Sequence, residues 1–213
     1  MTPCIILADD HSMIRKGIRL LITSRLGYKN VYEADSCNSL MNELKSVPCT
    51  HMILDVIFPD GTCLEIVPII RKLYPDVKIM IFSMQPVDIY ADAFRQYDIY
   101  YYLPKSSNEE EISTCIKSFL NNEPYHNKNK STAIRNNPFS SLAPRELEIL
   151  HYLLNGYKTN DIAATLNLSN STVSTFKKRI FDKTGTTSLS QLFEIASVNN
   201  LGFFAGTSKP KND

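Results

Sequence analysis

The sequence contains no apolar stretch long enough to cross a membrane. No run of about 18 uncharged apolar residues occurs among its 213 residues, and a membrane-spanning helix needs about that many. The first ten residues, MTPCIILADD, have no basic segment before their apolar residues and become acidic at Asp9. A secretory signal peptide has a basic start instead. We therefore expect a cytoplasmic protein that does not associate with a membrane.

Cysteine is scarce and irregularly spaced. The chain has five cysteines, none of them beyond Cys115, and no CxxC pair occurs. A disulfide framework has an even number of cysteines, and a zinc site has closely paired ones. We interpret the five side chains as free thiols in a reducing compartment.

Net charge is nearly absent, but the two parts of the chain differ. The formal net charge is +1 at pH 7. Residues 1–120 contain 12 Lys and Arg against 15 Asp and Glu, whereas residues 121–213 contain 11 against 7. The apolar fraction of 43% is that of a globular protein and excludes a wholly disordered chain. The basic second part is a candidate for contact with a polyanion such as nucleic acid.

The first 120 residues alternate between two hydrophobic periods. Short apolar runs typical of buried strands are followed by stretches with apolar residues at helical spacing, such as Ile14, Ile18 and Ile22. The alternation occurs five times and predicts an α/β domain, a doubly wound five-stranded parallel sheet with helices on both faces. The predicted strands are Cys4–Ala8, Val31–Ala34, His51–Asp55, Lys78–Ser83 and Ile99–Leu103.

The remaining residues predict a linker and a small helical domain. Residues 121–137 contain six Asn and few apolar side chains, so we expect a linker over 121–140. Residues 141–205 predict a small all-α domain of four helices, and residues 206–213 a flexible tail. The predicted helices are Pro144–Leu154, Thr159–Leu166, Ser171–Lys183 and Ser188–Asn199.

Polar residues follow several of the predicted strands. Asp9 and Asp10 end the first strand, Asp55 the third and Ser83 the fourth, while Lys105 lies just beyond the fifth. These ends meet at one edge of a parallel sheet, where ligands bind. Three carboxylates there would repel one another, and a bound Mg²⁺ ion would offset their negative charge. One carboxylate could then attack a phosphoryl group and form an acyl phosphate, with the metal and the Lys offsetting charge.

The segments ILADDH, MILDVIFPDG, IMIFS and YYLPK occur in this order within residues 3–120. Together they resemble the receiver domain of bacterial two-component response regulators, which implies a flavodoxin-like fold and a sensor histidine kinase as partner. A single Asp at a strand end more often caps a helix, as Asp10 could, and only the joint pattern favours a functional site. The resemblance implies that Asp55 is the phosphoryl acceptor and that Lys105 pairs with the phosphoryl oxygens. It implies Ser83 and Tyr102 as the switch residues. The implied Mg²⁺ ligands are Asp9, Asp10, Asp55 and the backbone carbonyl of Ile57.

The helical part contains a short helix, a tight turn and a longer helix, which is a helix-turn-helix pattern. Thr159 and Ser169 are the expected caps of the two helices. On the longer helix, Val173, Phe176 and Ile180 share one face, and hydroxyls and cations occupy the opposite one, as major-groove binding requires. The candidate DNA-binding residues are Ser171, Ser174, Thr175, Lys177, Lys178 and Arg179.

Segments such as LAPRELEIL and STVSTFKKRI resemble the LuxR/NarL-type output domain, in particular the BvgA/EvgA-like subgroup of virulence and fimbrial regulators. The resemblance implies Ser174, Thr175 and Lys178 as base readers and Lys177 and Arg179 as phosphate contacts. It also implies a homodimer on two-fold sites of double-stranded promoter DNA.

The predicted function is a transcription factor, not an enzyme, whose phosphorylation at Asp55 controls dimerisation and sequence-specific DNA binding. One alternative is a regulator that binds DNA without phosphorylation and uses its receiver for protein–protein interaction. Another is an aspartyl-phosphate phosphatase, which has a second acid two residues after its nucleophile, where this chain has Ile57. A third is an adaptor that binds only proteins.

Overall fold

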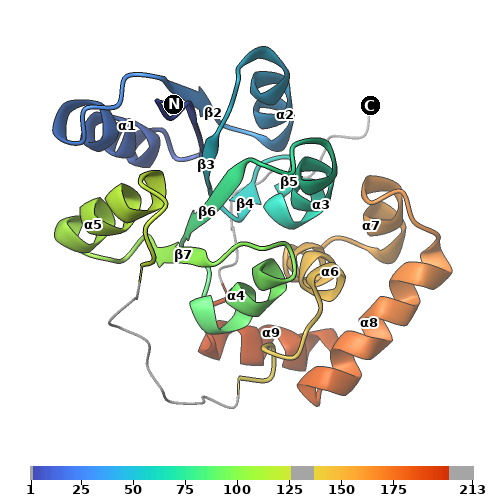
Figure 1. Ribbon diagram of the computed structural model, residues 1–213. Helices are drawn as coiled ribbons and strands as arrows, with labels where there is room; N and C mark the ends of the chain where they lie inside the picture. Colours follow the sequence, from blue (N-terminus) through green and yellow to red (C-terminus); the bar gives the residue numbers. More distant parts are fainter. Residues whose placement is uncertain (1, 126–136, 202–213) are drawn as a thin grey trace. The chain divides into compact units, whose positions relative to one another are not determined.

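A computed structural model of the protein describes residues 2–125 and 137–201 (Figure 1). These residues form two compact units, one built around a sheet and one of helices alone. The central part of the predicted linker 121–140, the end of the predicted domain 141–205 and the tail 206–213 lie outside them. Among the described segments, no helix has the length and apolar composition that spanning a membrane requires.

The sheet has five parallel strands in the order β2-β1-β3-β6-β7 (Figure 1). The chain starts at β1, turns to the neighbouring edge strand β2, and then crosses to β3, β6 and the other edge strand β7, so the predicted doubly wound fold is confirmed. The strands are β1 (Ile5–Ala8), β2 (Val31–Ala34), β3 (His51–Leu54), β6 (Lys78–Ser83) and β7 (Tyr101–Pro104).

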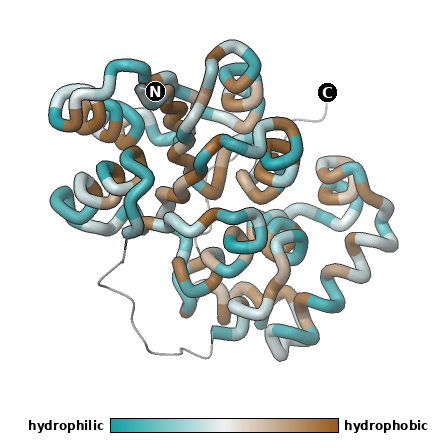
Figure 2. Tube along the Cα trace, in the orientation of Figure 1, coloured by the Kyte–Doolittle hydropathy of each residue, from teal (hydrophilic) through white to brown (hydrophobic). Residues whose placement is uncertain are grey.

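Both faces of the sheet are covered, which explains why its strands are almost wholly apolar (Figure 2). Alternate strand residues such as Ile5 and Leu7 pack against α1 (Ser12–Leu20) and α5 (Glu109–Leu120). The helices α2 (Cys37–Ser46) and α3 (Cys63–Leu73) lie on the other face (Figure 1). The remaining helix between two strands, α4, spans Val87–Arg95 and follows β6 in the chain.

Some local features differ from the expectations. The helix predicted by the spacing of Ile14, Ile18 and Ile22 is α-helical only as far as Leu20 and ends in a π-helical turn, Leu21–Arg25. A short antiparallel hairpin, β4 (Ile57–Phe58) with β5 (Gly61–Thr62), follows Asp55 and has no counterpart in the predicted elements. The fifth strand of the sheet begins at Tyr101 rather than at residue 99.

The second unit contains α6 (Pro144–Leu154), α7 (Thr159–Thr165), α8 (Asn170–Thr184) and α9 (Leu189–Val198), in agreement with the prediction. As predicted, Ser169 caps α8, since its side chain accepts a hydrogen bond from the backbone N–H of Thr172. The expectation that Thr159 caps α7 is wrong. Thr159 is the first helical residue, and the Asp161 carboxylate accepts from the N–H of Lys158, which holds the cap position.

Candidate functional site

Asp55 is buried at the end of β3 and is contacted at both carboxylate oxygens. Ser83 Oγ, at the end of β6, donates to Oδ1 at 2.5 Å, and the backbone N–H of Val56 donates to the same oxygen at 2.6 Å. Lys105 Nζ lies 2.5 Å from Oδ2. The structure therefore brings together a carboxylate, a hydroxyl and an ammonium from three strand ends, as the sequence predicts.

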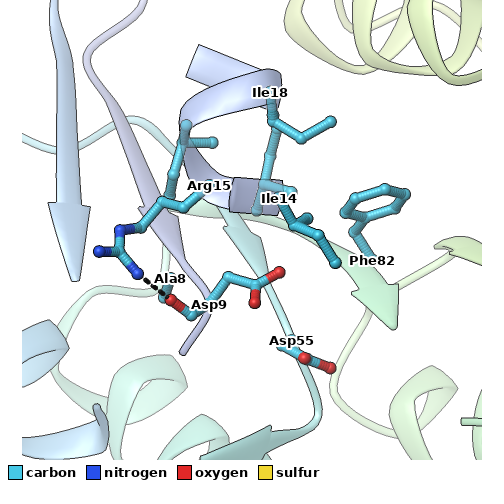
Figure 3. Close-up of a pocket in the computed structure, with 9 residues that line it drawn as sticks. Ala8, Asp9, Ile14, Arg15, Ile18, Asp55 and Phe82 are labelled. Atoms are coloured by element: carbon cyan, nitrogen blue, oxygen red, sulfur yellow. Dashed lines mark hydrogen bonds between the residues drawn. The ribbon is translucent and has the colours of Figure 1, made fainter. Parts of the chain in front are cut away.

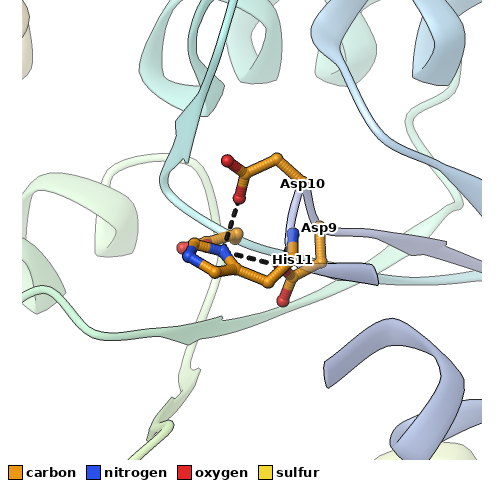
Figure 4. Close-up of side chains that lie close together, drawn as sticks. Asp9, Asp10 and His11 are labelled. Atoms are coloured by element: carbon orange, nitrogen blue, oxygen red, sulfur yellow. Dashed lines mark hydrogen bonds and ion pairs between the residues drawn. The ribbon is translucent and has the colours of Figure 1, made fainter. Parts of the chain in front are cut away.

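Asp9 and Asp10 lie beside Asp55 at the end of β1. Lys105 Nζ is 2.6 Å from Asp9 Oδ2, so this one ammonium bridges two carboxylates. Asp9, Asp10, His11 and Asp55 each offer an oxygen or nitrogen atom within 4.8 Å of the others. Figure 4 shows the His11 ring turned toward the carboxylates of Asp9 and Asp10.

The charges of this cluster do not balance. Asp9, Asp10 and Asp55 carry three negative charges when ionised, and Lys105 supplies one positive charge. Asp10 Oδ1 is also shielded from solvent and accepts no hydrogen bond, although His11 Nδ1 lies 2.6 Å from it. A buried carboxylate oxygen in that position needs a cation or a donor. The donor set is one that a hard divalent ion prefers.

Arg15, on the first turn of α1, fixes the backbone of Asp9. Its Nη1 donates to the Asp9 carbonyl at 2.5 Å (Figure 3). Its Nε donates to Glu33 Oε2 at 2.8 Å. The pKa of Glu33 is lowered, chiefly by a hydrogen bond from Arg19 and against the effect of burial. A cavity of about 10 Å³, close to the volume that one water needs, lies between this turn and Asp55.

Ile57 and Tyr102 lie on elements that adjoin β3 and β6: β4 follows β3 in the chain, and β7 pairs with β6. Ile57 opens β4 two residues after Asp55, where β4 pairs with β5. Tyr102 is buried in β7, and its hydroxyl donates to the carbonyl of Gln85 at 2.9 Å. Gln85 follows Ser83 by two residues, and its N–H lies 3.3 Å from Ser83 Oγ. A chain of hydrogen bonds therefore connects Asp55, through Ser83 and Gln85, to Tyr102.

The helix α8 has the two faces that the sequence predicts. Val173 and Ile180 are fully buried in the second unit, while Phe176 is half-buried. Five of the six candidate DNA-binding residues lie on the other side, whereas Lys177, four residues after Val173 and three before Ile180, lies beside the buried face. Those that are exposed are Ser171, Ser174, Thr175, Lys178 and Arg179, and the half-buried one is Lys177.

Three of these side chains contact other residues of the same helix. Thr175 Oγ1 donates to the carbonyl of Ser171 at 2.9 Å. Lys177 Nζ lies 5.7 Å from the ring centre of Phe181, and the Arg179 guanidinium lies 5.6 Å from that of Phe176. Such cation–π contacts limit the rotamers of the two cations and keep their charge at the helix surface.

The matched families agree with this geometry. Residues 5–117 match the response regulator receiver domain, which is more than half of the chain. The chain is a response regulator. Residues 140–196 match the luxR family of bacterial regulatory proteins, so this response regulator is a transcription factor with a receiver domain and a DNA-binding helix-turn-helix domain.

Several curated proteins are similar to this response regulator over most of their length. The virulence-factor transcription regulator BvgA of Bordetella pertussis is 27% identical over 206 residues, which cover 92% of this chain and 98% of BvgA. The response regulator UvrY of Escherichia coli is 27% identical over 188 residues, covering 84% and 86%. The Fimbriae Z protein of Escherichia coli is 26% identical over 204 residues, covering 92% and 97%.

Solved structures of the RcsB response regulator from Salmonella have the same fold. One, bound to promoter rprA in the presence of BeF₃⁻, superposes with a TM-score of 0.77 at 23% identity, covering 91% of this chain and 97% of RcsB. Another has a TM-score of 0.76 at 25% identity and covers 93% and 99%.

Sequence reasoning missed several residues that shape these sites. In the receiver they are His11, in the carboxylate cluster, and Arg15, on the backbone of Asp9. In the helical unit they are Glu146 and Lys183, which form an ion pair of 2.6 Å between α6 and α8. The Asp-Asp-His order could have indicated His11, but Glu146 and Lys183 are too far apart in the sequence for any local pattern to pair them.

Proposed function

We propose that Asp55 accepts a phosphoryl group from a sensor histidine kinase. A carboxylate oxygen of Asp55 attacks the phosphorus, the P–O bond of an acyl phosphate forms, and the P–N bond of the donor phosphohistidine breaks. The leaving imidazole takes a proton. The observation that carries the proposal is the contact of Asp55 with both Ser83 and Lys105, because a hydroxyl and an ammonium there can bind phosphoryl oxygens.

The residues around Asp55 fit the Mg²⁺ ion that receiver domains bind at such an acidic pocket. We propose Asp9, Asp10, Asp55 and the backbone carbonyl of Ile57 as its protein ligands. The buried Asp10 Oδ1 without a hydrogen bond and the excess of negative charge support this assignment. A bound Mg²⁺ would offset the charge on the transferring phosphoryl group.

Ser83 and Tyr102 are the proposed switch. A phosphoryl group on Asp55 would replace Oδ1 as the partner of Ser83 Oγ. Because Ser83 and Tyr102 are both hydrogen-bonded to Gln85, movement of Ser83 changes the hydrogen bonding of Tyr102. The two arrangements are the states whose populations phosphorylation shifts, toward a form that dimerises and binds DNA.

We propose α8 as the recognition helix that enters the major groove of double-stranded promoter DNA. Its base-reading residues would be Ser174, Thr175 and Lys178, with Lys177 and Arg179 on phosphates and Ser171 at the helix start. RcsB has been solved bound to promoters, and as two dimers on DNA, which supports a homodimer on two-fold sites. The proposed domains are a receiver over 1–120, a linker over 121–140, a LuxR-type domain over 141–205 and a tail over 206–213.

Phosphorylation is tested by incubating the protein with Mg²⁺ and a small phosphodonor and measuring its intact mass. The wild type should gain one phosphoryl group, and Asp55→Asn should gain none. The matched control is Asp76→Asn, which replaces an exposed Asp before β6, at the opposite edge of the sheet, and should label like the wild type. Equal labelling of Asp55→Asn would contradict the assignment of the acceptor.

Control of DNA binding is tested on sequences selected from a random DNA pool by the phosphorylated protein. Phosphorylation should raise both the affinity for these sequences and the dimer fraction measured by sedimentation, and Asp55→Asn should show neither change. Tight, specific binding that is the same with and without phosphodonor would favour the regulator that works without phosphorylation.

A further inference from the structure

The imidazole of His11 faces the carboxylate cluster rather than capping its own helix. His11 holds the N-cap position of α1, but its side chain makes no capping hydrogen bond. Ser, Thr, Asp and Asn are preferred at this position, and their absence costs a helix about 1 kcal/mol. The backbone N–H of His11 donates to Asp9 Oδ1 at 2.8 Å, which fixes the residue against the cluster.

The ring nitrogen approaches two carboxylates. His11 Nδ1 is 2.6 Å from Asp10 Oδ1 and 3.3 Å from Asp9 Oδ1 (Figure 4). Asp10 Oδ1 nevertheless has no hydrogen-bond partner, so the 2.6 Å approach lacks the alignment of a hydrogen bond. Neighbouring ligands of one ion with bonds of about 2.1 Å are about 3.0 Å apart, so a small rotation of either side chain would let this nitrogen and this oxygen bind the same ion.

We propose that His11 Nδ1 is a ligand of the divalent-cation site, so that the site also binds borderline transition-metal ions such as Co²⁺. The inference rests on the proposed cation site of Asp9, Asp10 and Asp55. The four candidate ligand atoms lie within 4.8 Å of one another. Two ligands on opposite sides of an ion with bonds of about 2.1 Å are about 4.2 Å apart, so small side-chain rotations complete the set.

An imidazole ligand changes which ions the site prefers. Carboxylate and carbonyl oxygens suit Mg²⁺, whereas imidazole nitrogen suits Co²⁺, Ni²⁺ and Zn²⁺. The carboxylates of Asp9, Asp10 and Asp55 remain when His11 is replaced. Loss of His11 should therefore weaken the binding of Co²⁺ much more than that of Mg²⁺.

The experiment compares untagged wild type with His11→Ala by titrating Co²⁺ and Mg²⁺ in a calorimeter. The loss of even an outer-shell partner of a metal changes affinity about 10–100-fold, so the Co²⁺ affinity of His11→Ala should fall at least about tenfold, and its Mg²⁺ affinity should change less than about twofold. His126→Ala is the control for loss of a histidine elsewhere in the chain, and it should bind both ions like the wild type.

A spectroscopic measurement identifies the ligand directly. Electron spin echo spectra of bound Mn²⁺ should show the coupling of a coordinated imidazole nitrogen in the wild type and in His126→Ala, but not in His11→Ala. Equal Co²⁺ affinity in wild type and His11→Ala, or a nitrogen coupling that survives in His11→Ala, overturns the proposal. Failure of the wild type to bind Mg²⁺ would instead contradict the proposed cation site itself.

Discussion

The ammonium of Lys105 lies 2.5 Å from Asp55 Oδ2, and the side chain that carries it is only 1% exposed. The same ammonium is 2.6 Å from Asp9 Oδ2. A buried charge is stable only when it is paired, and here one cation serves two carboxylates. The pocket is therefore organised around Lys105, and a divalent cation would add to its charge.

Lys105→Met is expected to destabilise the receiver, because it leaves buried carboxylates without their cation. Breaking a buried ion pair costs about 3–5 kcal/mol, and the free energy of unfolding without Mg²⁺ should fall by about this amount. Saturating Mg²⁺ should restore part of the loss, since it supplies positive charge to the same carboxylates. Urea denaturation with and without Mg²⁺ measures both effects.

The control for this substitution is Lys16→Met, which removes an exposed ammonium from α1. It should change the free energy of unfolding by less than about 0.5 kcal/mol. A loss for Lys105→Met that is as small as the loss for Lys16→Met would contradict the view that Lys105 balances the pocket.

Lys183 is expected to anchor α8 rather than bind DNA. Its Nζ lies 2.6 Å from Oε2 of the buried Glu146 and 3.1 Å from the carbonyl of Ser141. Lys183→Met leaves that carboxylate with the N–H of Ala143 as its remaining donor. The Lys183 side chain is 37% exposed, so solvent screens the ion pair. We therefore expect the free energy of unfolding to fall by about 1–2 kcal/mol, less than for a fully buried pair. The dependence of DNA affinity on salt should not change.

Lys178→Met is the matched comparison, because Lys178 is exposed on the proposed DNA-binding face of the same helix. Stability should stay within about 0.5 kcal/mol, while the slope of log affinity against log salt should decrease by about one. Thermal denaturation and a salt titration of DNA binding separate the two lysines. A reduced salt slope for Lys183→Met would show that Lys183 contacts phosphate after all.

The sheet and its carboxyl edge could be predicted because the determining signals are local. Each strand is a short apolar run, and Asp9, Asp55 and Ser83 each end or directly follow such a run. A parallel sheet then brings them together irrespective of the details of packing. The same reasoning predicted the two faces of α8, where the spacing of Val173 and Ile180 marks the buried side.

Other features could not be predicted because they depend on contacts between distant segments or on very short elements. The strands β4 and β5 have two residues each, too few to show an alternating pattern. The π-helical turn at Leu21–Arg25 is not distinguishable from an α-helix by apolar spacing alone. Arg15 was not assigned a role because its partner at Asp9 is a backbone carbonyl, which no side-chain pattern reports.

His51 is expected to make the receiver less stable at acidic pH. Burial lowers the pKa of His51, and its ring packs edge-on against Phe119 at 5.1 Å. The folded state therefore binds a proton less readily than the unfolded state, whose histidine pKa is about 6.5. The stability that this difference contributes is present above about pH 6.5 and is lost as the pH falls below that value.

His51→Phe removes this titration and retains an aromatic ring beside Phe119. Between about pH 7.5 and about pH 5, the free energy of unfolding of His51→Phe should fall less than that of the wild type. His151, whose pKa burial lowers to about 4, is present in both proteins, so its contribution cancels in the comparison. Parallel pH profiles for the two proteins would contradict the prediction.

Gly185 ends α8 in a left-handed conformation, with φ of +66°, and Gly17 lies within α1, where an added Cβ meets nothing within 4 Å. Gly185→Ala should lower the free energy of unfolding by about 1–2 kcal/mol, because the left-handed region is unfavourable for a residue with a Cβ. Gly17→Ala should raise it by about 0.5–1 kcal/mol, because alanine loses less conformational entropy in a helix. Thermal denaturation of the two variants should therefore shift the melting temperature in opposite directions. A lower melting temperature for Gly17→Ala would contradict the prediction and would mean that the exposed side of α1 is packed against another part of the protein.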